Sequence, residues 1–179
     1  MYTKQDAIPE EVRGARLFAI NAHGEQRYGS YPYVKHLDDV FNVLLEFGCD
    51  DLNILKAAYL HDVLEDTNCD PLKLHLSFGA AVAVIVDCVT SRPVKNRKER
   101  NRATYLIIRT FVSSIMLKLA DRIANVRACI ADNDSKLEMY RKEYPEFRHA
   151  LHTEDQSLFG MWEELDCLMD GALQTGEPR

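Results

Sequence analysis

The segment 57–67 gathers chemically active side chains within a stretch that otherwise has the composition of a buried helix. If the segment is helical, His61 and Glu65 share one face because they are four residues apart. Asp62 and Asp66 share a neighbouring face, so all of these side chains can line one wall of a cavity. Carboxylates near a helix C-terminus oppose its macrodipole, which favours a positive charge there. A divalent metal ion would supply that charge; the alternative is a solvated helix end with an incidental histidine.

Asp121 is a further candidate, in a part of the chain that we predict to be a long helix. It lies between the apolar positions Leu119 and Ile123, and Asn125 falls on the same face one turn later. An aspartate beside a core stripe is costly to bury unless it has a partner. Arg122 or another nearby cation can be that partner, and so can a metal ion.

One metal ion can join these segments, with a ligand set of His36, His61, Asp62 and Asp121. Alone, His36 is more typical of a structural histidine of its helix than of a metal ligand. Two imidazoles and two carboxylates form a mixed nitrogen and oxygen donor set, which suits Mn²⁺, Fe²⁺ or Zn²⁺ better than Ca²⁺. Such an ion would lower the pKa of a bound water and polarise a phosphoryl oxygen. Glu65 and Asp66 would then orient the water or accept its proton.

The overall composition limits the class of protein. The chain has 179 residues, which is enough for one well-buried domain and short for two. Its 46% hydrophobic and 28% charged residues are ordinary for a globular protein. A net charge of −6 argues against nucleic-acid binding, although a local basic cluster or a metal can still attract a small anion.

The five cysteines and the apolar runs indicate the compartment. The cysteines are odd in number, widely spaced and never arranged as a CxxC motif, which is typical of reduced thiols. Charged residues interrupt every apolar run near the N-terminus, so we expect no signal peptide. Because no run approaches the roughly 20 apolar residues of a membrane span, we expect a cytoplasmic protein with no membrane partner.

The positions of apolar, capping and breaking residues predict helices throughout. We expect helices over about 9–24, 34–48, 51–67, 70–79 and 80–90, followed by a basic loop at 91–102 that enters another helix. Ser113 or Ser114 should cap a long helix that ends at about 132, with Ile130 among its inward residues. Thr153 and Gln156 should form a capping box for a last helix that ends at Gly171.

These elements predict an all-α, single-domain helical bundle. The whole chain, 1–179, forms the domain, with a core at about 9–131, C-terminal helices at about 134–171 and a frayed tail at 172–179.

In order along the chain, His36, the His61–Asp62 pair and Asp121 resemble the H…HD…D pattern of HD-domain metal-dependent phosphohydrolases. The chain resembles most closely the hydrolase domain of RelA/SpoT-type enzymes and their stand-alone small alarmone hydrolases. The segments that carry this resemblance, within roughly residues 15–130, are 22–27 with 33–36, 60–67, 78–79 with 86–90, and 118–127.

The resemblance implies an activity and a role for each matching residue. The reaction would remove the 3′-pyrophosphate of guanosine tetra- or pentaphosphate, the alarmones of the stringent response, with Mn²⁺ as the usual metal. The ligands would be His36, His61, Asp62 and Asp121, and the catalytic carboxylates Glu65 and Asp66. Arg27 would pack on the nucleotide base and Asn125 would lie near the ribose. Lys95, Lys98 and Arg102 can meet the substrate phosphates, or they can simply be solvated.

The chain departs from the family pattern near the expected base and ribose subsites. Ser91 stands where a lysine is frequent, a serine common in the opening loop is replaced near Gly29, and Ala128 stands where a polar residue is frequent. Two alternatives therefore stay open. One is an HD hydrolase of another nucleotide, such as NADPH or a nucleoside phosphate. The other is a non-catalytic, nucleotide-binding HD domain. In each case the partner is a small anionic nucleotide; the sequence leaves the oligomeric state open.

Overall fold

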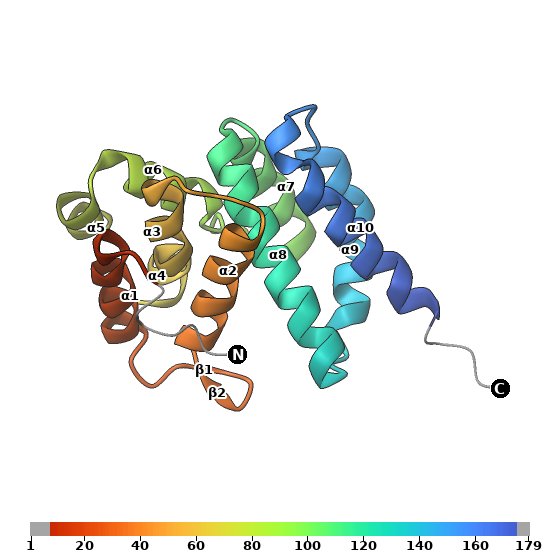
Figure 1. Ribbon diagram of the computed structural model, residues 1–179, viewed down its shortest axis with the longest axis horizontal. Helices are drawn as coiled ribbons and strands as arrows, with labels where there is room; N and C mark the ends of the chain where they lie inside the picture. Colours follow the sequence, from red (N-terminus) through yellow and green to blue (C-terminus); the bar gives the residue numbers. More distant parts are fainter. Residues whose placement is uncertain (1–7, 175–179) are drawn as a thin grey trace.

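The structure, a computed structural model, describes residues 8–174, which are almost entirely helical (Figure 1). The helices are α1 (Glu10–His23), α2 (Val34–Glu46), α3 (Leu52–Leu60), α4 (Val63–Asp66), α5 (Pro71–Phe78), α6 (Ala80–Val89), α7 (Arg97–Ile108), α8 (Val112–Asp132), α9 (Lys136–Leu151) and α10 (Phe159–Gln174), with a 3₁₀ turn, η2, at Gln156–Leu158. The strands β1 (Arg27–Tyr28) and β2 (Tyr31–Pro32) pair antiparallel in a short hairpin. The prediction of an all-α fold is confirmed.

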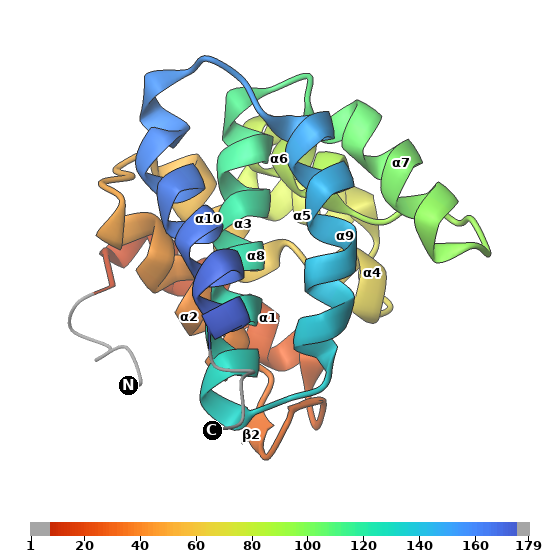
Figure 2. The same ribbon diagram turned by 90° about the vertical axis from the view of Figure 1, so that its right-hand side faces the viewer.

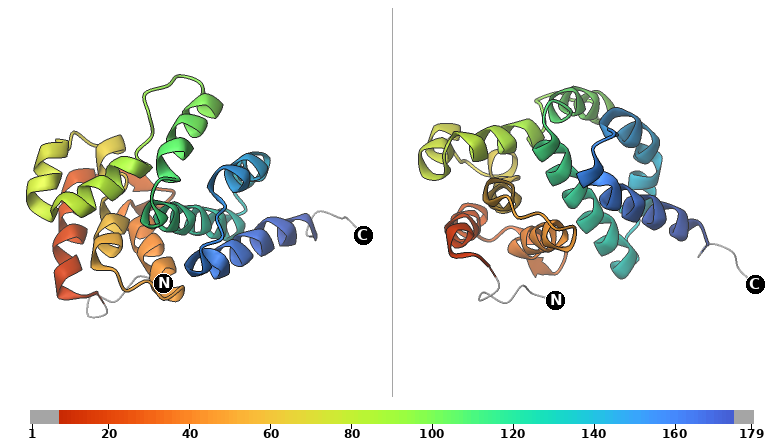
Figure 3. Two further views of the ribbon diagram at one scale, coloured as in Figure 1. Left: turned by 90° about the horizontal axis from the view of Figure 1, so that it is seen from above. Right: turned by 45° about the horizontal axis from the view of Figure 1, so that its top comes forward.

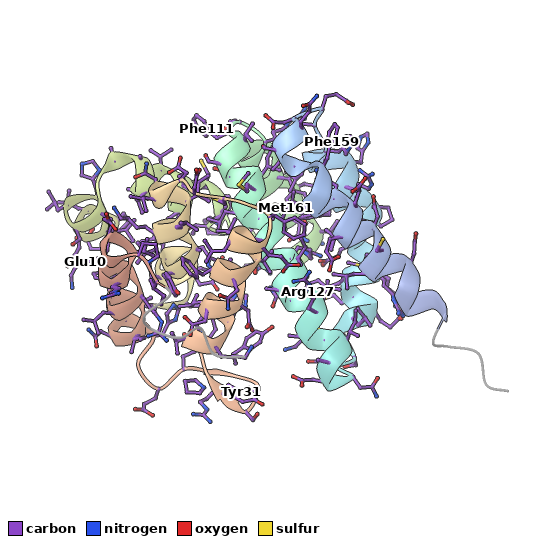
Figure 4. All side chains as sticks on the ribbon, in the orientation of Figure 1. Glu10, Tyr31, Phe111, Arg127, Phe159 and Met161 are labelled. Atoms are coloured by element: carbon purple, nitrogen blue, oxygen red, sulfur yellow. The ribbon has the colours of Figure 1, made fainter. Side chains whose placement is uncertain are left out.

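Helix α8 is the central element of the bundle. It packs against α2, α3 and α6 on one side and against α7, α9 and α10 on the other. Figure 2 shows α9 and α10 flanking it. Its buried positions include Leu119, Ile123 and Val126, which recur at helical spacing. Met161, on α10, is also buried and lies on the side of that helix that packs against α8 (Figure 4). Because α8 contacts both halves of the bundle, its polar residues can meet side chains from distant segments.

A buried ion pair ties the first helices together. Asp38, on α2, is fully buried and accepts hydrogen bonds from Arg16 Nε at 2.8 Å and Arg16 Nη2 at 2.9 Å. The Tyr59 hydroxyl, on α3, donates to the same carboxylate at 3.1 Å. These bonds satisfy the carboxylate, so its burial is not left uncompensated. The pair fixes α1, α2 and α3 relative to one another, and with them the segments that carry the histidines.

The predicted helix 51–67 is wrong in one respect that matters for the site. The helix begins as expected after Asp51, whose side chain accepts from Asn53 N at 2.7 Å, but α3 ends at Leu60. His61 and Asp62 lie in a turn, and α4 is a separate, single turn of helix that begins at Val63. The His–Asp pair is therefore presented by a break between helices instead of by a continuous helical face.

Several predicted helix ends are also corrected. Helix α8 begins at Val112 without a side-chain cap, so Ser113 and Ser114 are not its N-cap. Ile130 is 43% exposed and does not belong to the core. Asp155, not the expected Thr153–Gln156 box, caps the turn before α10 by accepting from Ser157 N.

The tail and the basic segment differ from expectation as well. Residues 172–174 continue α10 where a frayed tail was predicted, and the rest of that tail, 175–179, lies outside the described residues. Helix α7 already begins at Arg97, because the Asn96 side chain accepts from Lys98 N and Glu99 N. The connection before it projects from the bundle (Figure 3). No helix within residues 8–174 is long and apolar enough to span a membrane.

Candidate metal centre and catalytic cavity

His36, His61 and Asp62 form a cluster of potential metal ligands. The Nε2 atoms of the two histidines lie 3.3 Å apart, although the residues are 25 positions apart in the chain. Asp62 Oδ2 lies 3.0 Å from His61 Nε2 and 3.6 Å from His36 Nε2. Both imidazoles are buried. Helix α2 supplies His36, and the turn after α3 supplies the other two residues.

Asp121 reaches the same cluster from the middle of α8. Its Oδ1 lies 3.4 Å from His36 Nε2 and 3.9 Å from His61 Nε2. Lys118 Nζ, one turn earlier, lies 2.8 Å from the other carboxylate oxygen. The sequence predicted Arg122 or another nearby cation as the partner of Asp121, and the structure shows that this cation is Lys118. The structure thus brings together all of the residues predicted as ligands.

Hydrogen bonds orient the two imidazoles. His61 Nδ1 lies 2.8 Å from the carbonyl oxygen of Ala58, which only accepts, so Nδ1 carries a proton and the neutral ring presents the lone pair of Nε2 to the cluster. A metal-binding histidine is typically held in this way, by a bond from its other ring nitrogen. His36 Nδ1 is buried and has no hydrogen-bond partner among the described residues, so its Nε2 atom makes the polar contacts of that ring.

The charges of the cluster depend strongly on one another. Burial alone would lower the pKa of His61, but the adjacent Asp62 carboxylate raises it to about 9. Burial would raise the pKa of Asp62, but His61 holds it well below its ordinary value. In the same way, Lys118 lowers the pKa of Asp121 against the effect of burial. Both carboxylates are therefore ionised and attract a cation.

A divalent metal ion fits this donor set. Ligand atoms at about 2.1 Å from one ion lie about 3 Å apart when they are neighbours in its shell. The separations of 3.0–3.9 Å between the imidazole nitrogens and the carboxylate oxygens are close to that value. The mixture of imidazole and carboxylate suits a first-row transition metal.

His36, Asp62 and Asp121 line a cavity of about 240 Å³. Its wall also includes Glu65 and Asp66, both exposed. Glu65 Oε2 accepts a hydrogen bond from the backbone N–H of Ser91 at 3.0 Å. Asp66 Oδ2 accepts from Gln26 Nε2 at 2.8 Å. Each predicted catalytic carboxylate is thus held by one donor, with oxygen atoms left to meet a water molecule.

The cations that line the cavity are Arg97, Arg100, Lys118 and Arg122. The sequence suggested other residues for the phosphates, but Lys95, Lys98 and Arg102 do not line it. Arg102 instead pairs with Glu146 on α9. Because α7 already begins at Arg97, Arg97 and Arg100 lie on the side of the helix that faces the cavity. The local sequence does not show which basic residues of this segment face the cavity.

A second cavity of about 270 Å³ adjoins the first, and Tyr28, Tyr33, Asn125 and Tyr140 line both. Arg27 lines the second cavity only. Asn125 Nδ2 donates to Asp121 Oδ1 at 2.5 Å, while its Oδ1 accepts from the Tyr28 hydroxyl at 3.0 Å. Asn125 therefore contacts a predicted metal ligand and also borders the space where a nucleoside would fit.

Sequence reasoning missed two tyrosines of the opening loop. The Tyr28 ring stacks on His36 with the ring centroids 4.9 Å apart. The Tyr33 hydroxyl donates to Asp62 Oδ2 at 2.5 Å. Burial, and then the neighbouring Asp62 carboxylate, raise the pKa of Tyr33 well above its ordinary range, so it remains a donor. The available signal was the position of Tyr33, three residues before His36.

Comparison with proteins of known sequence identifies similar chains. A guanosine-3′,5′-bis(diphosphate) 3′-pyrophosphohydrolase of Aquifex aeolicus is 34% identical over 174 residues, which cover 92% of this chain and 24% of that protein. The mouse protein of that name, MESH1, is 34% identical over 115 residues, which cover 62% of this chain and 64% of the mouse protein. The chain therefore spans less than two thirds of the length of each of these relatives.

Solved structures share the fold. One described as a metazoan ortholog of SpoT superposes with a TM-score of 0.78 at 24% identity, covering 94% of this chain and 97% of the other. The crystal structure of lmo0812 from Listeria monocytogenes EGD-e gives a TM-score of 0.68 at 20% identity, with 80% and 96% covered.

A family model described as HD domain matches residues 15–147 of this chain. This match confirms the predicted family and includes every residue of the cluster. An HD domain implies a divalent metal ion, and the His36–His61–Asp62 cluster offers a place for it. Since the match covers most of its length, the chain belongs to the HD domain family.

Proposed function

We propose that this protein is a Mn²⁺-dependent phosphohydrolase that removes the 3′-pyrophosphate of guanosine tetra- or pentaphosphate. The observation that carries the proposal is the convergence of two imidazoles and two carboxylates, each carboxylate 3.0–3.9 Å from the imidazole Nε2 atoms, beside a cavity lined by four cations. Relatives at 34% identity named as pyrophosphohydrolases of this compound support the choice of substrate.

The ligands in this proposal are His36, His61, Asp62 and Asp121. A divalent ion held by them would lower the pKa of a bound water and neutralise charge on the phosphoryl oxygens. Mn²⁺ is proposed because the donor set mixes imidazole with carboxylate and the family resemblance favours it; Fe²⁺ and Zn²⁺ suit the same donors.

Glu65 and Asp66 serve as the catalytic carboxylates. Both line the cavity, and each has one anchoring hydrogen bond, from Ser91 N and from Gln26 respectively. A carboxylate fixed in this way can orient the attacking water and accept its proton. The water adds to the phosphorus attached to the ribose 3′ oxygen, the bond to that oxygen breaks, and pyrophosphate leaves. The proton from the water goes to the 3′ oxygen, so the other product is guanosine diphosphate from the tetraphosphate and guanosine triphosphate from the pentaphosphate.

The two adjoining cavities support one placement of the nucleotide, with its phosphates in the first cavity and its nucleoside in the second. The phosphates would face the cations of the first cavity, where Arg100 supplies a planar donor suited to phosphate oxygens. Arg97 lines the same cavity, with its Nε and Nη2 bonded to Glu143. The nucleoside would lie in the second cavity, with Arg27 against the base and Asn125 near the ribose.

The cysteines, which are odd in number and widely spaced, further support a cytoplasmic enzyme.

The test is release of pyrophosphate and guanosine diphosphate from guanosine tetraphosphate in the presence of Mn²⁺. The controls are the same reaction with a chelator and the His61→Ala variant, which removes one ligand. A substrate panel with NADPH and nucleoside phosphates distinguishes the alternative hydrolases. Pyrophosphate release that is absent from both controls is the expected result. Faster hydrolysis of another nucleotide would overturn the proposed reaction. So would a Mn²⁺-bound protein that hydrolyses none of the nucleotides in the panel.

A further inference from the structure

A chain of hydrogen bonds connects the end of α1 with Asp66. His23 Nδ1 lies 2.8 Å from Gln26 Oε1, and Gln26 Nε2 lies 2.8 Å from Asp66 Oδ2. His23 is buried, whereas Asp66 is exposed at the end of the four-residue helix α4. The chain therefore reaches from the protein interior to a carboxylate on the rim of the catalytic cavity.

The chemistry of the groups fixes the direction of each bond. An ionised carboxylate only accepts hydrogen bonds, so the Gln26 amide must turn its Nε2 toward Asp66 and its Oε1 toward His23. Because that oxygen also only accepts, His23 must carry a proton on Nδ1. The other ring nitrogen, Nε2, is buried and has no hydrogen-bond partner among the described residues. His23 thus selects one of the two orientations of the Gln26 amide.

The ring of His23 is itself held in place by Tyr33. The two rings stack with centroids 4.3 Å apart and an interplanar angle of 26°. Tyr33 also donates to Asp62, so the ring that supports His23 contacts the proposed metal cluster. This arrangement gives the hydrogen-bond chain a rigid base.

We infer that Gln26, oriented by His23, is a positioning residue that aims the Asp66 carboxylate at the attacking water. The inference rests on the proposed function, in which Asp66 is a catalytic carboxylate. An exposed side chain on a single helical turn has many rotamers, and a bond at 2.8 Å to a fixed amide selects one of them.

The first test is Gln26→Glu, which keeps the shape of the side chain and replaces the donor with a carboxyl group. At alkaline pH this group is ionised and repels Asp66; as the pH falls it takes up a proton and can donate again. We expect kcat to fall by about 10–100-fold at neutral and alkaline pH. The deficit relative to wild type should shrink only as the pH falls toward the pKa of the introduced carboxyl group, which the nearby Asp66 carboxylate raises above its ordinary value of about 4.3, and the Mn²⁺ affinity should be unchanged. A deficit that is constant with pH, or a matching loss of Mn²⁺ affinity, would overturn the inference.

A pair of His23 variants separates hydrogen bonding from stacking. His23→Asn retains an N–H donor near the position of Nδ1 but loses the ring that stacks on Tyr33. His23→Phe retains a ring and loses the donor. We expect His23→Phe to show the kcat deficit of Gln26→Ala and His23→Asn to remain close to wild type. The reverse order would mean that stacking, not the hydrogen-bond chain, is what matters.

A measurement that needs no turnover keeps this inference separate from the proposed reaction. ¹⁵N NMR of the histidine rings in the metal-free protein reports which nitrogen of His23 carries the proton. The inference requires the proton on Nδ1 in wild type and a change in that signal in Gln26→Leu. A proton on Nε2 would overturn the inference even in an active enzyme. An Nδ1 proton in a protein that does not hydrolyse guanosine tetraphosphate would contradict only the reaction.

Discussion

His36 and His61 face each other inside the protein with their Nε2 atoms 3.3 Å apart. His61 directs its Nδ1 proton to Ala58, so its neutral ring presents the lone pair of Nε2 toward His36. Without a metal ion, the Asp62 carboxylate, 3.0 Å from His61 Nε2, raises the pKa of His61 to about 9 against the effect of burial, so Nε2 also carries a proton at neutral pH. A metal ion bound by both Nε2 lone pairs would take the place of that proton. The pair is therefore a place where a positive charge is held, either as a proton or as a metal ion.

Removal of Asp121 should abolish metal binding and turnover together. In Asp121→Ala the cluster loses one of its two carboxylates, and Lys118 remains nearby as an uncompensated positive charge. Loss of an outer-shell partner alone typically costs about 10–100-fold in metal affinity, so we expect a loss above about 100-fold for a direct ligand. Titration calorimetry with Mn²⁺ and pyrophosphate release measure the two effects. Asp87→Ala, an exposed aspartate of α6 outside the cavity, is the control. Tight metal binding by Asp121→Ala would contradict its assignment as a ligand.

Glu65 should affect the rate without affecting the metal. Its carboxylate contacts Ser91 N and lines the cavity, but it does not belong to the histidine cluster. We expect Glu65→Ala to bind Mn²⁺ as wild type does and to lose about 10²–10⁴-fold in kcat, the usual contribution of a general acid or base. Glu65→Gln keeps an acceptor for Ser91 N, so an equal loss in this variant points to the charge and not to the loop. A kcat within twofold of wild type in both variants would exclude the catalytic role.

The inner face of α7 should recognise the substrate phosphates. Arg100 lines the catalytic cavity, whereas Lys95, in the connection before α7, does not. Arg100→Gln and Lys95→Gln change the net charge equally, so any long-range attraction falls by the same amount in both. We expect Arg100→Gln to raise KM by about 10-fold, because it removes a planar donor to phosphate oxygens, and Lys95→Gln to leave KM unchanged. Steady-state kinetics at constant ionic strength make the comparison. Equal effects would favour general electrostatic attraction over direct contact.

Much of the fold follows from local sequence. The spacing of apolar residues predicted α1, α2 and α6 within a few residues of their observed ends, and the capping and breaking residues at 70–71 and 79 did the same for α5. Asp70, predicted to cap a helix with proline in its first turn, does so by accepting from Leu72 N at 2.8 Å. These features depend on neighbouring residues, which is why sequence alone reveals them.

The details that fail depend on tertiary contacts. The sequence of 57–67 continues a helical pattern through His61 and Asp62, but the structure breaks it there and turns both side chains toward α2 and α8. The cation beside Asp121 also depends on geometry: Lys118 and Arg122 are both near it in sequence. The Cζ atom of Arg122 instead lies 4.7 Å from the ring centroid of Tyr140 and 4.6 Å from that of Phe147. The residue types and their order were thus enough to predict the members of the cluster. The contacts that support the cluster can be seen only once the helices are packed together.

Glu143, on α9, should make a pH-dependent contribution to the free energy of unfolding through its ion pair with Arg97 on α7. Its Oε1 accepts a hydrogen bond from Arg97 Nε at 2.5 Å, and its Oε2 lies 3.6 Å from Arg122 Nη1. Burial opposes ionisation, but the bond from Arg97 lowers the pKa of Glu143 below its ordinary value of 4.5. A carboxyl group with a lowered pKa in the folded protein stabilises it above the unfolded pKa. This contribution is lost as the pH falls through the folded pKa.

We therefore expect Glu143→Gln to reduce the free energy of unfolding by about 1 kcal/mol at pH 7, since the pair is partly exposed. The difference from wild type should shrink steadily as the pH falls below about 4.5, where the wild-type carboxylate also takes up a proton. Urea unfolding of the metal-free protein at a series of pH values measures both quantities. Glu163→Gln, at an exposed position of α10, should show no difference at any pH. A Glu143→Gln deficit that persists undiminished at the acidic end would show that side-chain packing, not the ion pair, links the two helices.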